Sequence, residues 1–494
     1  MEPVPRSPAP SQNALSTADF LCHPRVLACL ERLRKHEEVH GKLIVSDVVD
    51  AKGHQYVNLV QKGGGVLGVA LVGYTYILEQ AGIRFLRLAG TSAGAINTAL
   101  LAVIGEKPDP KSEAILELLC KLELFALVDG HPTARWFIRK LIVYRNFAGR
   151  LKTGTLLLGG LAGLSIAVSL LGLGLEAKYP LAAAVTPIAF LLSGALLGLT
   201  AALAFFGNRL MARFNSAGLG INPGNYFYDW IKDRFKENQV CNTSDLNRKA
   251  QNTPELHLRE EREAGDLAGL QGDVTFIASE IVTGNKIQFP RMAGLFRQED
   301  KIDELQPAGY VRASMAIPIF FESYFINDIP HNDPMVKAKW EQTFGIPPPP
   351  AVRLVDGGLL SNFPINLFFN PQVQVPRLPT FGIDLDDTGS APKPPDDGFW
   401  ELPVYLGKML SALRSHYDKD FLQQHAVYQK GVGKIDLSKF NWLNFFLSDD
   451  DKKELFFKGA EAATDFLLQF DWPQYKEDQR VFRRKYHPQN PNQI

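Results

Sequence analysis

The hydrophobic and polar positions of residues 56–101 alternate between strand-like and helix-like patterns. Residues 56–60 and 84–89 are short apolar runs, which predict buried strands. Residues 69–81 are apolar with helical spacing, and Gly82 follows them, where a helix C-terminus favours glycine. A small-residue helix is expected at 95–101. This order of elements indicates a parallel, right-handed βαβα unit.

Two long stretches in the middle of the chain contain no charged residue. They cover residues 153–175 and 180–207, and each is long enough, at about 22 residues or more, to cross a hydrocarbon core as a helix. A short turn joins them, so the pattern predicts a membrane-inserted helical hairpin over residues 154–207. The alternatives are a helical pair buried in a water-soluble core and a hydrophobic oligomer interface.

Small and basic residues add to this prediction. Gly159 and Gly163, and likewise Gly194 and Gly198, have the spacing that lets helices pack closely. Residues 132–152 carry arginines, lysines and aromatic residues without an acid, as in helices that lie on anionic lipid. Basic residues flank both outer ends of the hairpin, so the positive-inside rule places the rest of the chain on the cytoplasmic face.

Composition excludes some function classes. The net charge of the 494 residues is zero, so no overall field favours nucleic acid. The 4 cysteines lack the spacing of metal ligands and indicate reduced thiols. Residues 1–17 are rich in proline and serine and lack the apolar core of a signal peptide. We therefore expect a disordered N-terminus, no secretory signal and no metal or other cofactor.

The chemistry is centred on Ser92, between the predicted strand 84–89 and the predicted helix 95–101. Gly90-Thr91-Ser92-Ala93-Gly94 fits the nucleophile elbow G-x-S-x-G. In such an elbow the flanking glycines, Gly90 and Gly94, allow a sharp turn that lifts the serine hydroxyl clear of the sheet. A nucleophilic serine also requires an oxyanion hole and a base.

A glycine run at residues 63–68 is the candidate oxyanion hole. Gly63, Gly65 and Gly68 also satisfy the dinucleotide fingerprint G-x-G-x-x-G, but the next strand does not end in the acidic residue that would bind a ribose. We therefore favour backbone amides of Gly63, Gly64 and Gly65 aimed at a developing oxyanion, over a Rossmann-type oxidoreductase or a turn without chemistry.

Asp356 is the candidate base. It ends the predicted strand 352–356 and precedes Gly357 and Gly358, at the strand edge where α/β folds place their sites. An isolated Asp-Gly-Gly is more often a turn. Asp386 and Asp387 follow another strand and are interpreted as loop acids, because no partner ligand has suitable spacing.

Four motifs together resemble the patatin-like phospholipase family. They are the glycine run 63–68, the elbow 90–94, Arg312 to Pro318, and Asp356-Gly357-Gly358 with Asn362 and Pro364. The resemblance covers about residues 56–387, extends weakly into 453–467, and leaves the hairpin as an insertion. Where the family usually has Lys or Arg before the last glycine of its loop, this chain has Leu67, which removes a positive charge from the loop.

The resemblance implies a Ser–Asp dyad, with Ser92 as nucleophile and Asp356 as base. His331 or His416 could in principle complete a triad, but one lies in a Pro/Asn/Asp loop and the other on a predicted helix. An aspartate acts directly as a base where burial raises its pKa or where it gains a proton transiently in a site poor in water.

The expected fold class is α/β, a patatin-like three-layer sandwich with a mainly parallel sheet plus the transmembrane-type hairpin. The expected segments are a disordered stretch (1–17), a helical segment (18–54), the catalytic domain in two parts (55–131 and 214–395), the basic flank with the hairpin (132–213), a C-terminal helical region (396–480) and a disordered tail (481–494).

The function expected is a membrane-associated, phospholipase A-type acyl hydrolase whose partners are an acyl lipid and the bilayer. A neutral-lipid lipase, a lysophospholipase and a catalytically silent membrane scaffold are the alternatives.

Overall fold

The computed structural model describes residues 15–132, 135, 147–175, 180–216, 218–259, 269–370, 373, 375–386 and 421–486. The chain forms two compact units. The first comprises Met1–Val128, Gly224–Pro318 and Ser323–Ile494, and the second comprises Asp129–Pro223 and Ile319–Glu322. Residues 1–14 and 487–494 of the expected disordered ends, residues 136–146 of the basic stretch, and residues 396–420 of the expected C-terminal helical region lie outside the described residues.

Within the described residues, the first unit holds a 10-stranded, mainly parallel sheet. Its parallel strands are, in spatial order, β12 (Val432–Asp436), β11 (Thr380–Asp386), β2 (Gln55–Gln61), β3 (Ile83–Thr91) and β6 (Asp273–Glu280). Antiparallel strands complete it: β10 (Val352–Asp356), β9 (Tyr324–Ile326), β7 (Asn285–Phe289), β1 (Val48–Asp50) and β5 (Leu256–Leu258). Every residue of β2 is buried, as expected for a strand covered on both faces. The predicted α/β class is confirmed.

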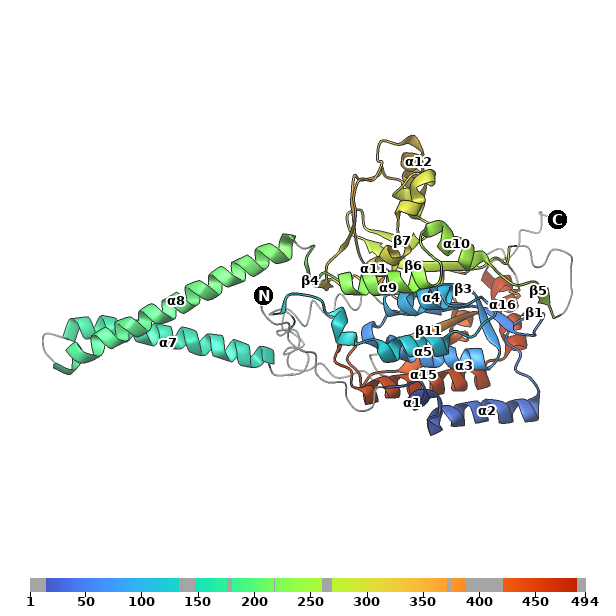
Figure 1. Ribbon diagram of the computed structural model, residues 1–494, viewed down its shortest axis with the longest axis horizontal. Helices are drawn as coiled ribbons and strands as arrows, with labels where there is room; N and C mark the ends of the chain where they lie inside the picture. Colours follow the sequence, from blue (N-terminus) through green and yellow to red (C-terminus); the bar gives the residue numbers. More distant parts are fainter. Residues whose placement is uncertain are drawn as a thin grey trace. The chain divides into compact units, whose positions relative to one another are not determined.

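Helices pack around this sheet (Figure 1). They include α3 (Val69–Gln80), α4 (Ala93–Val103), α5 (Ser112–Lys121) and α15 (Asp449–Gln469). The others are α1 (Ala18–Leu21), α2 (Pro24–His40), α9 (Asn225–Glu237), α10 (Thr243–Gln251), α11 (Pro307–Ser314), α12 (Pro334–Phe344), α14 (Ala426–Gln429) and α16 (Trp472–Tyr486). Short 3₁₀ turns are η1 (Gly65–Gly68), η2 (Leu124–Leu127), η3 (Ala293–Leu295), η4 (Glu299–Glu304) and η5 (Gly357–Leu359).

The predicted βαβα unit is confirmed as β2, α3, β3 and α4. Gly82 lies just beyond α3 with a φ of +74°, as a helix-ending glycine requires. Helix α15 packs against α3, and the two backbones meet at glycines. A Cβ atom at Gly73 would collide with the carbonyl oxygen of Phe456, and one at Gly459 with that of Ala70. The C-terminal region is therefore part of the same core as the elbow.

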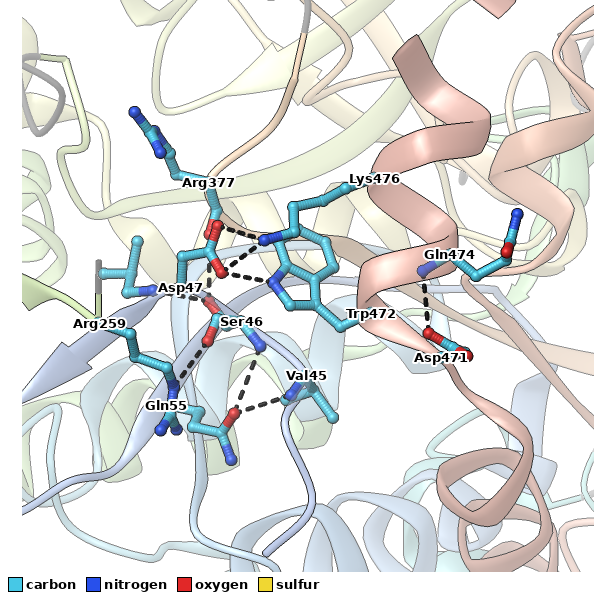
Figure 2. Close-up of polar contacts among 11 residues, drawn as sticks. Val45, Ser46, Asp47, Gln55, Arg259, Arg377, Asp471, Trp472, Gln474 and Lys476 are labelled. Carbon is cyan, nitrogen blue, oxygen red and sulfur yellow. Dashed lines mark hydrogen bonds and ion pairs between the residues drawn. The ribbon is translucent and has the colours of Figure 1, made fainter. Parts of the chain in front are cut away.

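A buried polar junction fixes α16 to the N-terminal segment (Figure 2). The carboxylate of Asp47 accepts hydrogen bonds from Trp472 Nε1 at 2.7 Å and from Lys476 Nζ at 2.9 and 3.0 Å. The backbone of Asp47 is bonded to Arg377 and Arg259. The C-terminal helix α16 is thus bonded to a carboxylate of the N-terminal segment.

Several predictions from the sequence are wrong. The sequence of residues 329–350 is rich in proline and predicts a loop. The segment instead contains α12, because Asp333 caps that helix and Pro334 stands at its first turn, where proline is tolerated. The C-terminal region is not purely helical, since β12 joins the sheet beside β11. Helix α16 extends to Tyr486, into the expected tail. The polar sequence of residues 253–272 predicts a surface insertion, but part of it is β5, paired with β1.

The second unit contains α7 (Phe147–Leu175) and α8 (Pro180–Ser216), which form the predicted helical hairpin, and the strand pair β4 (Gly220–Asn222) and β8 (Ile319–Phe321). Polar and small residues lie between the two helices. Ser193 Oγ lies 2.8 Å from Ser165 Oγ and 3.4 Å from Ser169 Oγ, and Gly172 lies against Thr186. Large apolar side chains instead face outward, including Leu161, Leu164 and Leu191.

Two predictions about the hairpin are corrected. The glycines at 159, 163, 194 and 198 do not mediate contact between the helices, since a Cβ atom at any of them would meet nothing within 4 Å. In the described part of the chain, no helix combines the length and the apolar character needed to traverse a bilayer. The sequence argument relied on the absence of charge, which alone does not make a helix apolar enough.

Candidate active site

Ser92 lies at a sharp, strained turn between β3 and α4. Its φ of 54° and ψ of −121° are unusual for a residue with a side chain, and such backbone strain is typical of a nucleophile elbow. Both flanking glycines are required by close packing: a Cβ atom at Gly90 would collide with the carbonyl of Gly94, and one at Gly94 with that of Gln61. Ser92 is therefore held at the N-terminus of α4, whose dipole favours negative charge.

The ends of β3 and β10 meet on one edge of β6. β3 runs parallel to β6 and ends with Thr91 opposite Ile277. β10 runs antiparallel to β6 and ends with Asp356 opposite Ala278, the next residue. β7 pairs with residues 276–280 and takes the other edge. Since a strand has two edges, β3 and β10 share one, and the residues that end them converge.

Contacts around the two strand ends agree with this placement. Thr91 Oγ1 donates a hydrogen bond to the Ser361 carbonyl at 3.0 Å, and a Cβ atom at Gly357 would lie 3.0 Å from Thr91 Cγ2. Both sequence-predicted motifs are thereby brought together in the fold, as expected for residues at the same sheet edge.

The C-terminal end of α11 anchors both predicted catalytic residues. Ser314 Oγ accepts a hydrogen bond from the Ser92 amide at 3.0 Å, and the Ala316 carbonyl accepts one from the Asp356 amide at 2.8 Å. The Asp356 carboxylate accepts one from the Gly358 amide at 2.7 Å. Ser92 and Asp356 are buried, at 1% and 4% exposed, and Ser92 Oγ has no hydrogen-bond partner among the described residues.

The glycine loop lies beside Ser92. A Cβ atom at Gly63 would lie 2.9 Å from Ser92 Cβ. Gly63 and Asn362 bond reciprocally: the Gly63 amide donates to the Asn362 carbonyl at 3.0 Å, and Asn362 Nδ2 donates to the Gly63 carbonyl at 3.2 Å. Of the three predicted oxyanion donors, Gly63 therefore already has an acceptor. The amides of Gly64 and Gly65 make no hydrogen bond within the described residues.

An apolar cavity adjoins the elbow. It encloses about 680 Å³, including open volume at its mouth. Gly65, Gly68 and Ala93 line one part of it, and it follows one face of α4 through Ile96 to Leu100. Residues of α3, α5, η2 and α9, the residues after α11, and Phe445 form the remaining walls. Such a cavity beside a nucleophile can receive an apolar chain.

The other candidate residues lie apart from this arrangement. His331 is exposed at the turn before α12, with Nδ1 3.1 Å from the Ile329 carbonyl, and His416 lies outside the described residues. Leu67 is fully buried, and Lys62 pairs with Asp384 at 2.6 Å, so neither supplies a charge to the loop. In the part of the chain that the structure describes, no acidic, histidine or cysteine cluster could hold a metal ion.

Sequence reasoning missed three features of the site. Ser314 supports the elbow through the Ser92 amide, although it lies in a motif that the sequence singled out. The cavity depends on residues from separate elements and leaves no local pattern. Residues 437–447, between β12 and α15, also reach the glycine loop, and only the three-dimensional fold reveals that contact.

The structure is thus an α/β fold in which a buried serine, at a strand-to-helix turn, lies beside a glycine loop. Residues 59–369 match the family model described as patatin-like phospholipase. The chain belongs to the patatin-like phospholipase family, and this membership supports hydrolysis of lipid esters as its activity.

Individual proteins are also similar to the chain. The uncharacterized protein YqhO of Bacillus subtilis (strain 168) is 55% identical over 418 residues, which are 84% of this chain and 100% of that protein. VipD from Legionella pneumophila aligns with a TM-score of 0.38 and 14% identity over 87% of this chain and 71% of its own. A chain of the heterodimeric complex ExoU-SpcU, from the type III secretion system of Pseudomonas aeruginosa, aligns with a TM-score of 0.31 and 14% identity. The alignment covers 85% of this chain and 52% of that one. At these scores neither solved structure bears on function.

Proposed function

We propose that the chain hydrolyses fatty acyl esters of membrane lipids, as a phospholipase A-type enzyme, through Ser92 and Asp356. The observation that carries the proposal is the convergence of the β3 and β10 ends on adjacent residues of β6. Asp356 is one of these strand ends, and Ser92, on a strained turn beside the glycine loop, directly follows the other.

The proposed reaction is a two-step acyl transfer. Ser92 Oγ attacks the ester carbonyl carbon while Asp356 takes its proton, and the amides of Gly64 and Gly65 stabilise the oxyanion. Collapse of the intermediate expels the lipid alcohol, which receives the proton from Asp356. Water then attacks the acyl carbonyl carbon and gives a proton to Asp356. When this second intermediate breaks the bond to Ser92 Oγ, that oxygen takes the proton back from Asp356, and the fatty acid is released.

Measurement of fatty acid release from phosphatidylcholine vesicles tests this proposal. Ser92→Ala should abolish release, and Asp356→Asn should lower it by about 10²-fold or more, as expected for loss of a general base. Asp300→Asn, an exposed control in η4, should behave like the wild type. Near-normal release by Asp356→Asn would contradict the dyad. Release from triacylglycerol or lysophospholipid alone would favour the neutral-lipid lipase or the lysophospholipase.

We also propose that the protein associates with the lipid surface through the hairpin α7–α8. The proposal is supported by the outward-facing apolar side chains and by the serine-rich contact between the helices, an arrangement opposite to that of a helical pair in water.

Flotation with phosphatidylcholine–phosphatidylglycerol vesicles tests the association. Replacement of Leu161, Leu164 and Leu191 by serine should reduce the floated fraction several-fold. Leu27→Ser, which alters a leucine of α2 that is 51% exposed, is the matched control and should float normally. Equal flotation of all variants would overturn the proposal.

A further inference from the structure

Residues 437–447, here called the C-terminal strap, join β12 to α15 and lie beyond the family match, which ends at residue 369. The strap is fixed at both ends. The Leu437 amide donates to the Asp386 carbonyl of β11 at 2.8 Å. Ser448 and Asp451 form a reciprocal capping box at the start of α15. Because α15 packs on α3, both anchors belong to the core that carries the elbow.

The strap bonds directly to the glycine loop. The Trp442 carbonyl accepts a hydrogen bond from the Val66 amide at 3.1 Å. It also lies so close to Gly65, whose φ is +56°, that a Cβ atom there would collide with it. The peptide between Gly65 and Val66 is thus oriented by the strap.

The strap also closes one wall of the apolar cavity. Phe445 is 4% exposed and lines that cavity together with Gly65 and Val66. Next to it, Phe446 packs on Phe125 of η2 with ring centroids 4.3 Å apart. Two Asn side chains stabilise the turns that present these rings: Asn441 accepts from the Leu443 amide and Asn444 from the Phe446 amide.

We infer that the strap is a specificity-determining element, with Phe445 limiting the width of the acyl chain that enters the cavity. This inference rests on the proposed function, because it assigns the cavity to the acyl group of the ester. The cavity extends along α4 from Ala93 to Leu100, about 10 Å at the rise of an α-helix. Phe445 and the aliphatic walls favour an unbranched aliphatic chain over a branched one.

The test compares straight-chain and methyl-branched acyl esters of p-nitrophenol with equal carbon number, using the full chain. Phe445→Ala should raise the branched-to-straight ratio of kcat/KM about fivefold or more, within the range that one methylene-sized difference contributes to selectivity. Phe445→Trp should move the ratio in the opposite direction. Phe440→Ala, which removes a strap ring that does not line the cavity, should leave the ratio unchanged.

The readouts separate the inference from the proposed function. Absent wild-type turnover of every ester would contradict the proposed function. An unchanged ratio in Phe445→Ala and Phe445→Trp, with wild-type turnover present, would overturn the inference alone. If Phe445→Ala fails to fold, Phe445→Leu keeps the position apolar and should still raise the ratio. An equal change of the ratio in Phe440→Ala would also overturn the inference, because a general loosening of the strap would then explain the change.

Discussion

At the scale of single residues, the backbone at Ser92 combines strain with function. A side chain at a φ of 54° is unfavourable, yet the turn is imposed by the close contacts of Gly90 and Gly94 with neighbouring carbonyls. The nucleophile is therefore held in place by its surroundings and not by its own preference, as observed where active sites store strain.

Substitution of Ser92 by glycine should make the protein more stable than substitution by alanine. Both changes remove the hydroxyl, but only glycine relieves the positive φ, so the free energy of unfolding should be higher by about 1 kcal/mol. Urea unfolding of the two variants measures this difference. Equal stability would show that the turn is not strained.

Burial of two lysines predicts a pH dependence of stability. Burial lowers the pKa of Lys107 to about 7 and that of Lys111 to about 8. Each lysine is deprotonated more readily in the folded chain than in the unfolded chain, where its pKa is about 10.4. At pH values between the folded and unfolded pKa values, the unfolded chain binds more protons than the folded chain. The contribution of these lysines to the free energy of unfolding therefore rises with pH.

The urea concentrations at the midpoint of unfolding, measured at pH 7, 8 and 9, should therefore include a stabilising contribution from these lysines that increases with pH. Lys107→Met should reduce this increase. Lys52→Met, at an exposed position, is the control and should keep it. A pH profile of Lys107→Met identical to that of the wild type would contradict the assignment.

At the scale of elements, local signals and long-range pairing differ in how far the sequence reveals them. The elbow, α3 and the glycine loop were predictable, because glycine placement and apolar periodicity act within a few residues. β5 and β8 were not, because strands of three residues depend on distant partners. α12 was missed because Pro334 was interpreted as a loop residue, although proline suits the first turn of a helix.

The same distinction applies to the site. Ser92, Asp356 and the glycine loop each carry a local motif, and the fold brings these motifs together. The occupied amide of Gly63 depends on Asn362, which is remote in sequence. The contribution of Phe445 depends on the path of the strap. Asn362 lies in a motif that the sequence shows, but its bond to Gly63 and the position of Phe445 follow only from the fold.

The attachment of α16 depends on one carboxylate. Asp47→Ala would leave Trp472 Nε1 and Lys476 without their buried acceptor. The free energy of unfolding should fall by about 2–4 kcal/mol. Glu477→Ala, which alters an exposed ion pair on the same helix, should change it by less than about 0.5 kcal/mol. Chemical denaturation checks both, and a loss no larger than that of Glu477→Ala would contradict the role of Asp47.

At the scale of the whole molecule, the C-terminal region completes the catalytic unit. β12 extends the sheet, α15 packs on α3, and the strap contacts the glycine loop. The family match covers residues 59–369, so the fold around the site uses segments on both sides of it. The hairpin belongs to the second compact unit and carries exposed apolar side chains.

Covalent labelling by a fluorophosphonate, with the modified peptide identified by mass spectrometry, tests the central claim most directly. The account predicts a label on Ser92, formed at least about 10²-fold more slowly in Asp356→Asn and absent in Ser92→Ala. A label on another residue, or an unchanged rate at Ser92 in Asp356→Asn, would contradict it.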